Sequence, residues 1–191
     1  MGALRRQSLA RGSVRAHTLF VVDDCDMTEA QPAPKFQFVG GDLSLDFCNT
    51  VGGKRGGIAR EKLHSVNDFI SWGEQAKLLT PNQAEVLRSY AARHPSEAAE
   101  LLSRAIELRE AIFRIFLCAA DERKPAQEDM ARLNAELSAS LGRLRIGSAK
   151  EGDGFGWQWA DEKLEPEHLL GPIARSAAEL LVQPDLVVKI H

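Results

Sequence analysis

The chain has 191 residues, of which 44% are hydrophobic and 27% are charged, values typical of a globular protein with a hydrophobic core. Its formal net charge of −3 and isoelectric point near 6.0 argue against a protein that covers nucleic acid with a basic face. No apolar run approaches the roughly 20 residues that a membrane-spanning helix requires, so the sequence predicts a soluble protein.

The first 22 residues differ from the rest in charge. They contain four arginines and no acidic residue, so they hold +4 of the charge and leave the remaining 169 residues near −7. Such a start resembles an organelle-targeting peptide or a nucleic-acid-binding arm. It is also what a plain extension looks like, since Met27 offers a second start. We interpret residues 1–35 as a poorly ordered extension.

A short hairpin is predicted where the chain becomes regular. Phe36 and Phe38 alternate with polar residues, glycines at 40–41 turn the chain, and residues 43–49 alternate again. The loop that follows, GGKRGG at residues 52–57, is glycine-rich and basic. It lacks the GxxxxGK[ST] spacing of a phosphate-binding loop, so we expect a mobile surface loop.

Three polar residues close the alternating stretch, namely Asp46, Asn49 and Thr50. Asp and Asn are poor strand residues and need partners when buried, so they either pin a turn or line a site. On a strand, Asp46 and Asn49 would face opposite sides. They converge if the strand ends at Phe47 and the chain turns or becomes helical, and we favour this geometry.

Five helices are expected next, at about residues 65–79, 80–94, 96–120, 127–141 and 166–182. The first two begin with capping-box signals, Ser65 with Asp68 and Thr80-Pro81 with Gln83. The fourth carries an apolar stripe of Met130, Leu133, Leu137 and Leu141. Gly171-Pro172 should kink the last helix or divide it in two.

Arg109 interrupts the apolar pattern of the longest helix, where its neighbours are Ala105, Ile112 and Phe113. Either its aliphatic part packs on apolar surface while its guanidinium group stays in water, or the side chain faces inward and pairs with a carboxylate, which Asp46 could supply. A buried pair of this kind would form a clamp for an anionic or polar ligand.

A second hairpin is predicted in RLRIGSAKEGDGFGWQWA, where an acidic glycine turn separates two short strands. Phe155, Trp157 and Trp159 share one face, which packs against helices or contributes, through Trp157, to a ligand pocket. The sequence thus predicts an α+β fold, mainly helical, with a small antiparallel sheet from two short hairpins.

The cysteines and histidines give no metal-binding pattern. Cys25, Cys48 and Cys118 lie far apart without a CxxC motif, which fits a reducing, cytoplasmic location. The five histidines show no HxxxH or HExxH spacing, and the adjacent Glu167-His168 pair is weak support for a metal site. Because no nucleophile–base pair or nucleotide motif is present either, the sequence does not predict an enzyme.

Several stretches together resemble the ABATE domain. They are FVGGDLSLDFCNTV, DFISW, LRSYA, AIELREAIFRIF, WQWA and LLVQPDL, in this order over about residues 36–188. The ABATE domain is the N-terminal module of bacterial stress-induced transcriptional regulators. The resemblance implies an α+β module thought to bind a small ligand, followed by a CGNR zinc finger to which DNA binding is attributed.

The chain departs from this pattern at its end, VVKIH, where the finger's first cysteine is expected. We therefore expect no zinc in this chain and DNA binding only through the missing finger. The predicted function is ligand sensing for transcription regulation, with an unknown small polar or anionic ligand and candidate ligand-binding residues Asp46, Asn49, Thr50, Arg109 and Trp157. The alternative is a protein-interaction or dimerisation module without a ligand, so a homodimer is left open.

Overall fold

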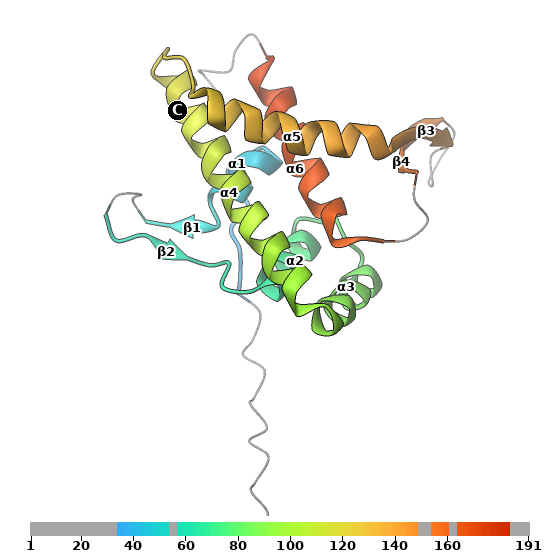
Figure 1. Ribbon diagram of the computed structural model, residues 1–191. Helices are drawn as coiled ribbons and strands as arrows, with labels where there is room; N and C mark the ends of the chain where they lie inside the picture. The colour runs from blue at the N-terminus through green and yellow to red at the C-terminus, as the bar shows by residue number, and fades with distance from the viewer. Residues whose placement is uncertain (1–33, 54–56, 149–153, 161–163, 184–191) are drawn as a thin grey trace, which may run out of the picture. The chain divides into compact units, whose positions relative to one another are not determined.

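The computed structural model describes residues 34–53, 57–148, 154–160 and 164–183 (Figure 1). The chain divides into two units, residues 1–32 and 33–191, and every described residue belongs to the second. The predicted extension at residues 1–35, with its second start at Met27, therefore lies almost wholly outside the described residues.

The described part is mainly helical, with two small antiparallel sheets of two strands each, which confirms the predicted α+β class. In chain order the elements are α1 (Leu43–Cys48), β1 (Val51–Gly52), β2 (Arg60–Glu61), α2 (Val66–Gln75), α3 (Pro81–Arg93), α4 (Pro95–Ala120), α5 (Gln127–Arg143), β3 (Leu144–Ser148), β4 (Phe155–Trp159), a 3-10 turn η1 (Pro166–Leu169) and α6 (Leu170–Leu181).

The first predicted strand is wrong, because residues 43–48 form the helix α1. Asp42 begins this helix, since its side chain accepts a hydrogen bond from the backbone N–H of Ser44 at 2.9 Å. The helical turn brings Ser44, Phe47 and Cys48 to one buried face, at spacings of three and four. The alternation of Leu43, Leu45 and Phe47 was therefore misleading.

The first hairpin consequently forms further along the chain than predicted. Val51 of β1 lies opposite Glu61 of β2, and the glycine-rich loop connects the two strands. Gly53 adopts a φ of +82°, and a Cβ at this position would lie 2.4 Å from the carbonyl oxygen of Ile58. Only glycine fits there. Residues 54–56 lie outside the described residues.

The predicted helices are confirmed with their start signals. Ser65 and Thr80 each form a capping box, with Asp68 and Gln83 respectively. The last helix is divided as expected, because η1 gives way to α6 at Leu170. Pro172 in the first turn of α6 explains the division, because its ring would clash with the backbone of an α-helical turn placed directly before it.

Helix α4 is the centre of the packing, and it contacts α1, α2, α3, α5 and α6 (Figure 1). An aromatic cluster fills the core beside it. The ring of Phe47 lies 4.9 Å from that of Trp72 and 5.7 Å from that of Phe69, centroid to centroid. All three side chains are fully buried. The helix α1 thus anchors the N-terminal part of the described chain to α2 through aromatic contacts.

Close packing also joins α2 to η1. A Cβ at Gly73 of α2 would lie only 2.5 Å from Cδ2 of Leu169, which is fully buried. Glycine therefore permits an approach that any side chain would obstruct. His168, the neighbour of Leu169, is also buried, and η1 contacts α4 and α6 as well.

The second predicted hairpin is confirmed by β3 and β4, in which Ile146 lies opposite Trp157. The side chains of Trp157 and Trp159 lie outside the described part. The contribution of Trp157 to a ligand pocket therefore stays a prediction. Among the helices that the structure describes, none has the length and apolar character needed to cross a membrane.

Candidate functional site

Arg109 faces inward, as one of the two sequence interpretations required. Its side chain is only 2% exposed. Nη1 and Nη2 donate to the two carboxylate oxygens of Glu61, at 2.8 and 2.6 Å. Nη1 also donates to Thr50 Oγ1 at 3.0 Å, and Nε donates to Glu110 Oε1 at 2.9 Å. Arg109 therefore ties α4 to the β1–β2 hairpin through a forked ion pair.

The predicted partner of Arg109 was wrong. Asp46 lies on α1, where its Oδ1 accepts the backbone N–H of Gly40 at 2.7 Å and so pins the turn before the helix. Asn49 is the exposed C-cap residue of α1. The structure thus brings Thr50 and Arg109 together but leaves Asp46 and Asn49 apart from them. A helix in place of a strand is the reason, because it turns Asp46 back towards Gly40.

The surroundings of Glu61 and Arg109 favour the charged form of both side chains. Burial raises the pKa of the Glu61 carboxyl, but the bond from Arg109 and the backbone N–H groups of Leu63 and Lys62 outweigh burial and lower it. Burial lowers the pKa of Arg109, whereas the bond and charge of Glu61 raise it above its ordinary value. Four hydrogen bonds occupy the guanidinium, which has five N–H donors in total. We therefore interpret the Arg109 cluster as structural.

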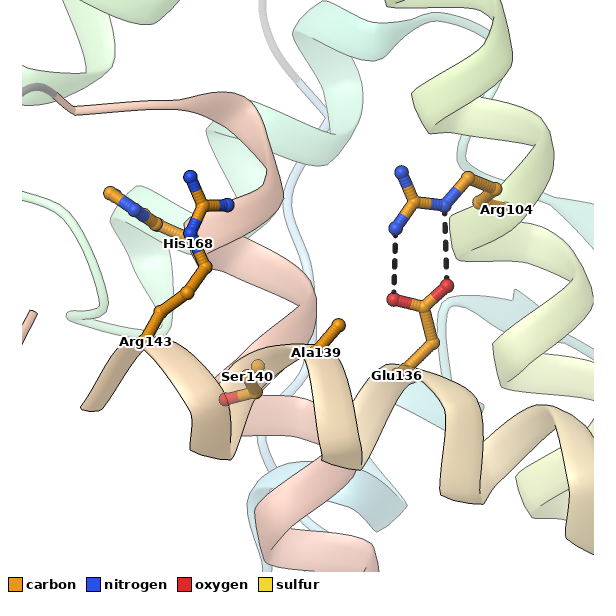
Figure 2. Close-up of a pocket in the computed structure, with 7 residues that line it drawn as sticks. Arg104, Glu136, Ala139, Ser140, Arg143 and His168 are labelled. Atoms are coloured by element: carbon orange, nitrogen blue, oxygen red, sulfur yellow. Dashed lines mark hydrogen bonds and ion pairs between the residues drawn. The ribbon is translucent and has the colours of Figure 1, made fainter. Parts of the chain in front are cut away.

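A different polar cluster lines a pocket of about 170 Å³ between α4, α5 and the η1–α6 segment (Figure 2). The lining residues are Arg104, Glu136, Ala139, Ser140, Arg143, His168 and Gly171. An engineered cavity of about 150 Å³ is large enough for benzene, so this pocket has room for a small metabolite. The candidate residues from the sequence are not among these described lining residues.

Two ion pairs border the pocket. Arg104 on α4 makes a forked pair with Glu136 on α5, through Nε at 3.2 Å and Nη2 at 3.0 Å. Arg143, at the end of α5, pairs with Glu165 just before η1. In Figure 2 the Arg104–Glu136 pair lies on one side, Arg143 and His168 lie on the other, and Ala139 and Ser140 lie between them. Both arginine side chains are 33% exposed, so solutes can reach them.

The two most buried polar residues of the pocket are His168 and Ser140, at 5% and 6% exposure. The Nδ1 atom of His168 accepts the backbone N–H of Glu165 at 3.3 Å, so the neutral ring carries its proton on Nε2. The Oγ atom of Ser140 is buried and has no hydrogen-bond partner among the described residues. Burying an unpaired hydroxyl costs free energy, which marks the pocket as a place for a polar ligand or water.

The same tautomer argues against catalysis by a serine–histidine pair. A base for Ser140 would need an unprotonated nitrogen that accepts its proton, and Nε2 of His168 is a donor in the neutral ring. Among the residues that the structure describes, no three His, Cys, Asp or Glu side chains gather to hold a metal ion.

Sequence reasoning missed this pocket because it misplaced the inner face of α5. The predicted stripe put Leu141 inside, but Leu141 is 47% exposed and Ser140 is buried in its place. Ser140 follows Leu137 at a spacing of three and Leu133 at a spacing of seven, so the pattern itself admitted it. The sequence did contain a signal for the pocket, because Ser140 is a polar residue at a position where the helical period of α5 calls for an apolar one.

The fold and the pocket together define a mainly helical α+β domain with a solvent-accessible pocket between its helices, bordered by charged and polar side chains. Residues 41–184 match the model of the ABATE family, described as "Putative stress-induced transcription regulator", and the chain belongs to this family. The family is one of transcription regulators, not of enzymes. No curated protein and no solved structure matches the chain.

Proposed function

We propose that this domain senses a small polar ligand for a transcription regulator, and that the ligand occupies the pocket between α4, α5 and η1–α6. Membership of a regulator family supports the regulatory role. The observation that carries the ligand site is the buried Oγ of Ser140, a pocket-lining atom without a hydrogen-bond partner among the described residues. A ligand that bonds to it would remove the cost of its burial.

The walls of the pocket suggest how occupancy would reach the rest of the domain. The pair of Arg104 with Glu136 links α4 to α5, and the pair of Arg143 with Glu165 links α5 to η1. His168 lines the pocket, and the next residue along the chain packs on α2. A ligand that binds Arg143 or His168 would shift η1 relative to α2. Small sliding motions of packed elements of this kind occur in proteins that switch between two conformations.

The alternative, an interaction module without a ligand, has less support. An interaction module would be expected to expose a broad apolar face on a helix. The exposed large hydrophobic residues of the described helices stand on different elements, with Val86 on α3, Leu117 on α4 and Leu141 on α5. Single exposed apolar side chains of this kind are common on protein surfaces.

A thermal-shift screen against small polar metabolites tests the proposal, with a blocked pocket as the comparison. Ala139→Leu puts a larger side chain into the pocket lining, whereas Ala135→Leu adds the same bulk one turn earlier, at an exposed position that is not among the described lining residues. We expect hits that raise the melting temperature of the wild type and of Ala135→Leu but not of Ala139→Leu. A hit that stabilises all three proteins equally would show that the ligand binds elsewhere.

A further inference from the structure

The described pocket is richer in hydrogen-bond donors than in acceptors. Arginine is a donor only, and His168 offers an N–H at Nε2. The acceptors in the lining side chains are the Glu136 carboxylate, which the guanidinium of Arg104 already occupies, and the hydroxyl of Ser140. A ligand that offers several acceptor oxygens complements such a lining.

The arginines of the pocket are paired with carboxylates. Arg104 pairs with Glu136 and Arg143 pairs with Glu165, so a ligand that binds either arginine competes with a carboxylate. Glu165 is not among the described lining residues and is 37% exposed, so water can solvate it when it is displaced. An anionic ligand would keep the charge of Arg143 balanced after this displacement, whereas a neutral ligand would not.

Resting on the proposed function, we propose that the ligand is a small oxyanion, a carboxylate or a phosphate, held by Arg143 and Ser140 with Arg104 opposite. Guanidinium groups bind both kinds of anion through forked, charge-assisted hydrogen bonds. Arg143 exchanges or shares its bond to Glu165 with the ligand, and Glu165 is exposed enough to be solvated when released. The hydroxyl of Ser140 donates to a ligand oxygen. About 170 Å³ admits phosphate or a dicarboxylate of four carbons.

Calorimetric titration of the full chain tests this assignment with three probes, namely inorganic phosphate, succinate and the neutral analogue succinamide. Arg143→Gln removes the proposed clamp. The matched control is Arg132→Gln, which removes an arginine of α5 that pairs with Glu107 and is not among the described lining residues of the pocket. Circular dichroism confirms that each variant is folded. Ser140→Ala provides a second test that leaves every charge in place.

We expect saturable binding of phosphate or succinate, whichever oxyanion fits, and none of succinamide. The affinity should fall by about tenfold or more in Arg143→Gln, the loss of one charge-assisted bond, and remain unchanged in Arg132→Gln. Ser140→Ala should also weaken binding. Absence of binding by both anions, or equal affinity in wild type and Arg143→Gln, would overturn the oxyanion assignment. The sensor proposal would still stand if the thermal-shift screen found a neutral ligand that stabilises the wild type but not Ala139→Leu.

Discussion

Two arginine–glutamate pairs of this domain have similar chemistry but different surroundings. Arg109 is 2% exposed and is satisfied by three different side chains, so it links elements that are already packed. Arg143 is 33% exposed and lines a pocket with the hydroxyl of Ser140, which has no hydrogen-bond partner among the described residues. The carboxylates of the two pairs are similarly exposed, at 33% for Glu61 and 37% for Glu165, so the difference lies in the arginines. A buried guanidinium with its hydrogen bonds filled holds a fold, whereas an accessible guanidinium in a pocket can be reached by a ligand.

The largest expected effect is on the pair of Arg109 and Glu61. Arg109→Ala removes a fully buried side chain and takes the guanidinium away from Glu61 and Thr50, so we expect a loss of about 2–5 kcal/mol of stability. Arg132→Ala breaks an exposed pair with Glu107 and should cost at most about 1 kcal/mol. Urea unfolding of both variants measures the difference. Equal costs would mean that Arg109 is not a structural residue.

Next in size is the contact between α2 and η1. Gly73→Ala pushes a methyl group into Leu169, and we expect it to destabilise the fold by about 1–3 kcal/mol, as overpacking does. Gly142→Ala on α5 is the matched control, because a Cβ there meets nothing within 4 Å. It should stabilise the helix by up to about 1 kcal/mol. A stabilising Gly73→Ala would contradict the close packing of η1 on α2.

A smaller effect, of opposite sign, is expected in the pocket. Ser140→Ala removes a buried hydroxyl that lacks a partner among the described residues, so the ligand-free protein should gain about 1 kcal/mol. Ser138→Ala, at an exposed position of the same helix, corrects for the better helix propensity of alanine. Thermal melts of the two variants decide the matter. A loss of stability in Ser140→Ala alone would show that the hydroxyl has a structural bond.

The smallest expected effect is a change in stability with pH. The folded-state pKa of Glu61 is lowered, so its contribution to stability is present above the unfolded pKa of about 4.3 and is lost as pH falls through the folded value. The wild type should therefore melt above Glu61→Gln at neutral pH, and the gap should close below about pH 4. Melting curves between pH 3 and 7 measure this gap. A gap that widens in acid would contradict the sign of the shift.

The sequence predicted the helices better than it predicted the site. Capping boxes at Ser65 and Thr80 are local chemistry and were therefore readable. The strand predicted at residues 43–49 was wrong because so short a stretch fits both the strand period and the helix period. Only the N-cap bond of Asp42 and the tertiary contacts of α1 decide between the two.

The site was harder to predict for the same kind of reason. An inward Arg109 was one of the two interpretations of the sequence, but its partner Glu61 comes from a hairpin whose register the sequence did not give. The pocket joins α4, α5 and η1, which are distant in sequence, and its arginines look like ordinary surface residues on their own helices. Such a site is a property of helix packing, which no local pattern encodes.

The most direct test of the account measures stability and ligand affinity together in Arg109→Gln and Arg143→Gln. Urea unfolding gives the first quantity, and titration with the tighter of phosphate and succinate gives the second. We expect Arg109→Gln to lose several kcal/mol of stability, about 3 or more, and to keep its affinity while folded. Arg143→Gln should lose at most about 1 kcal/mol but bind the anion at least about tenfold more weakly. If Arg143→Gln binds as the wild type does, the pocket is not the oxyanion site and the contrast between the two pairs is wrong.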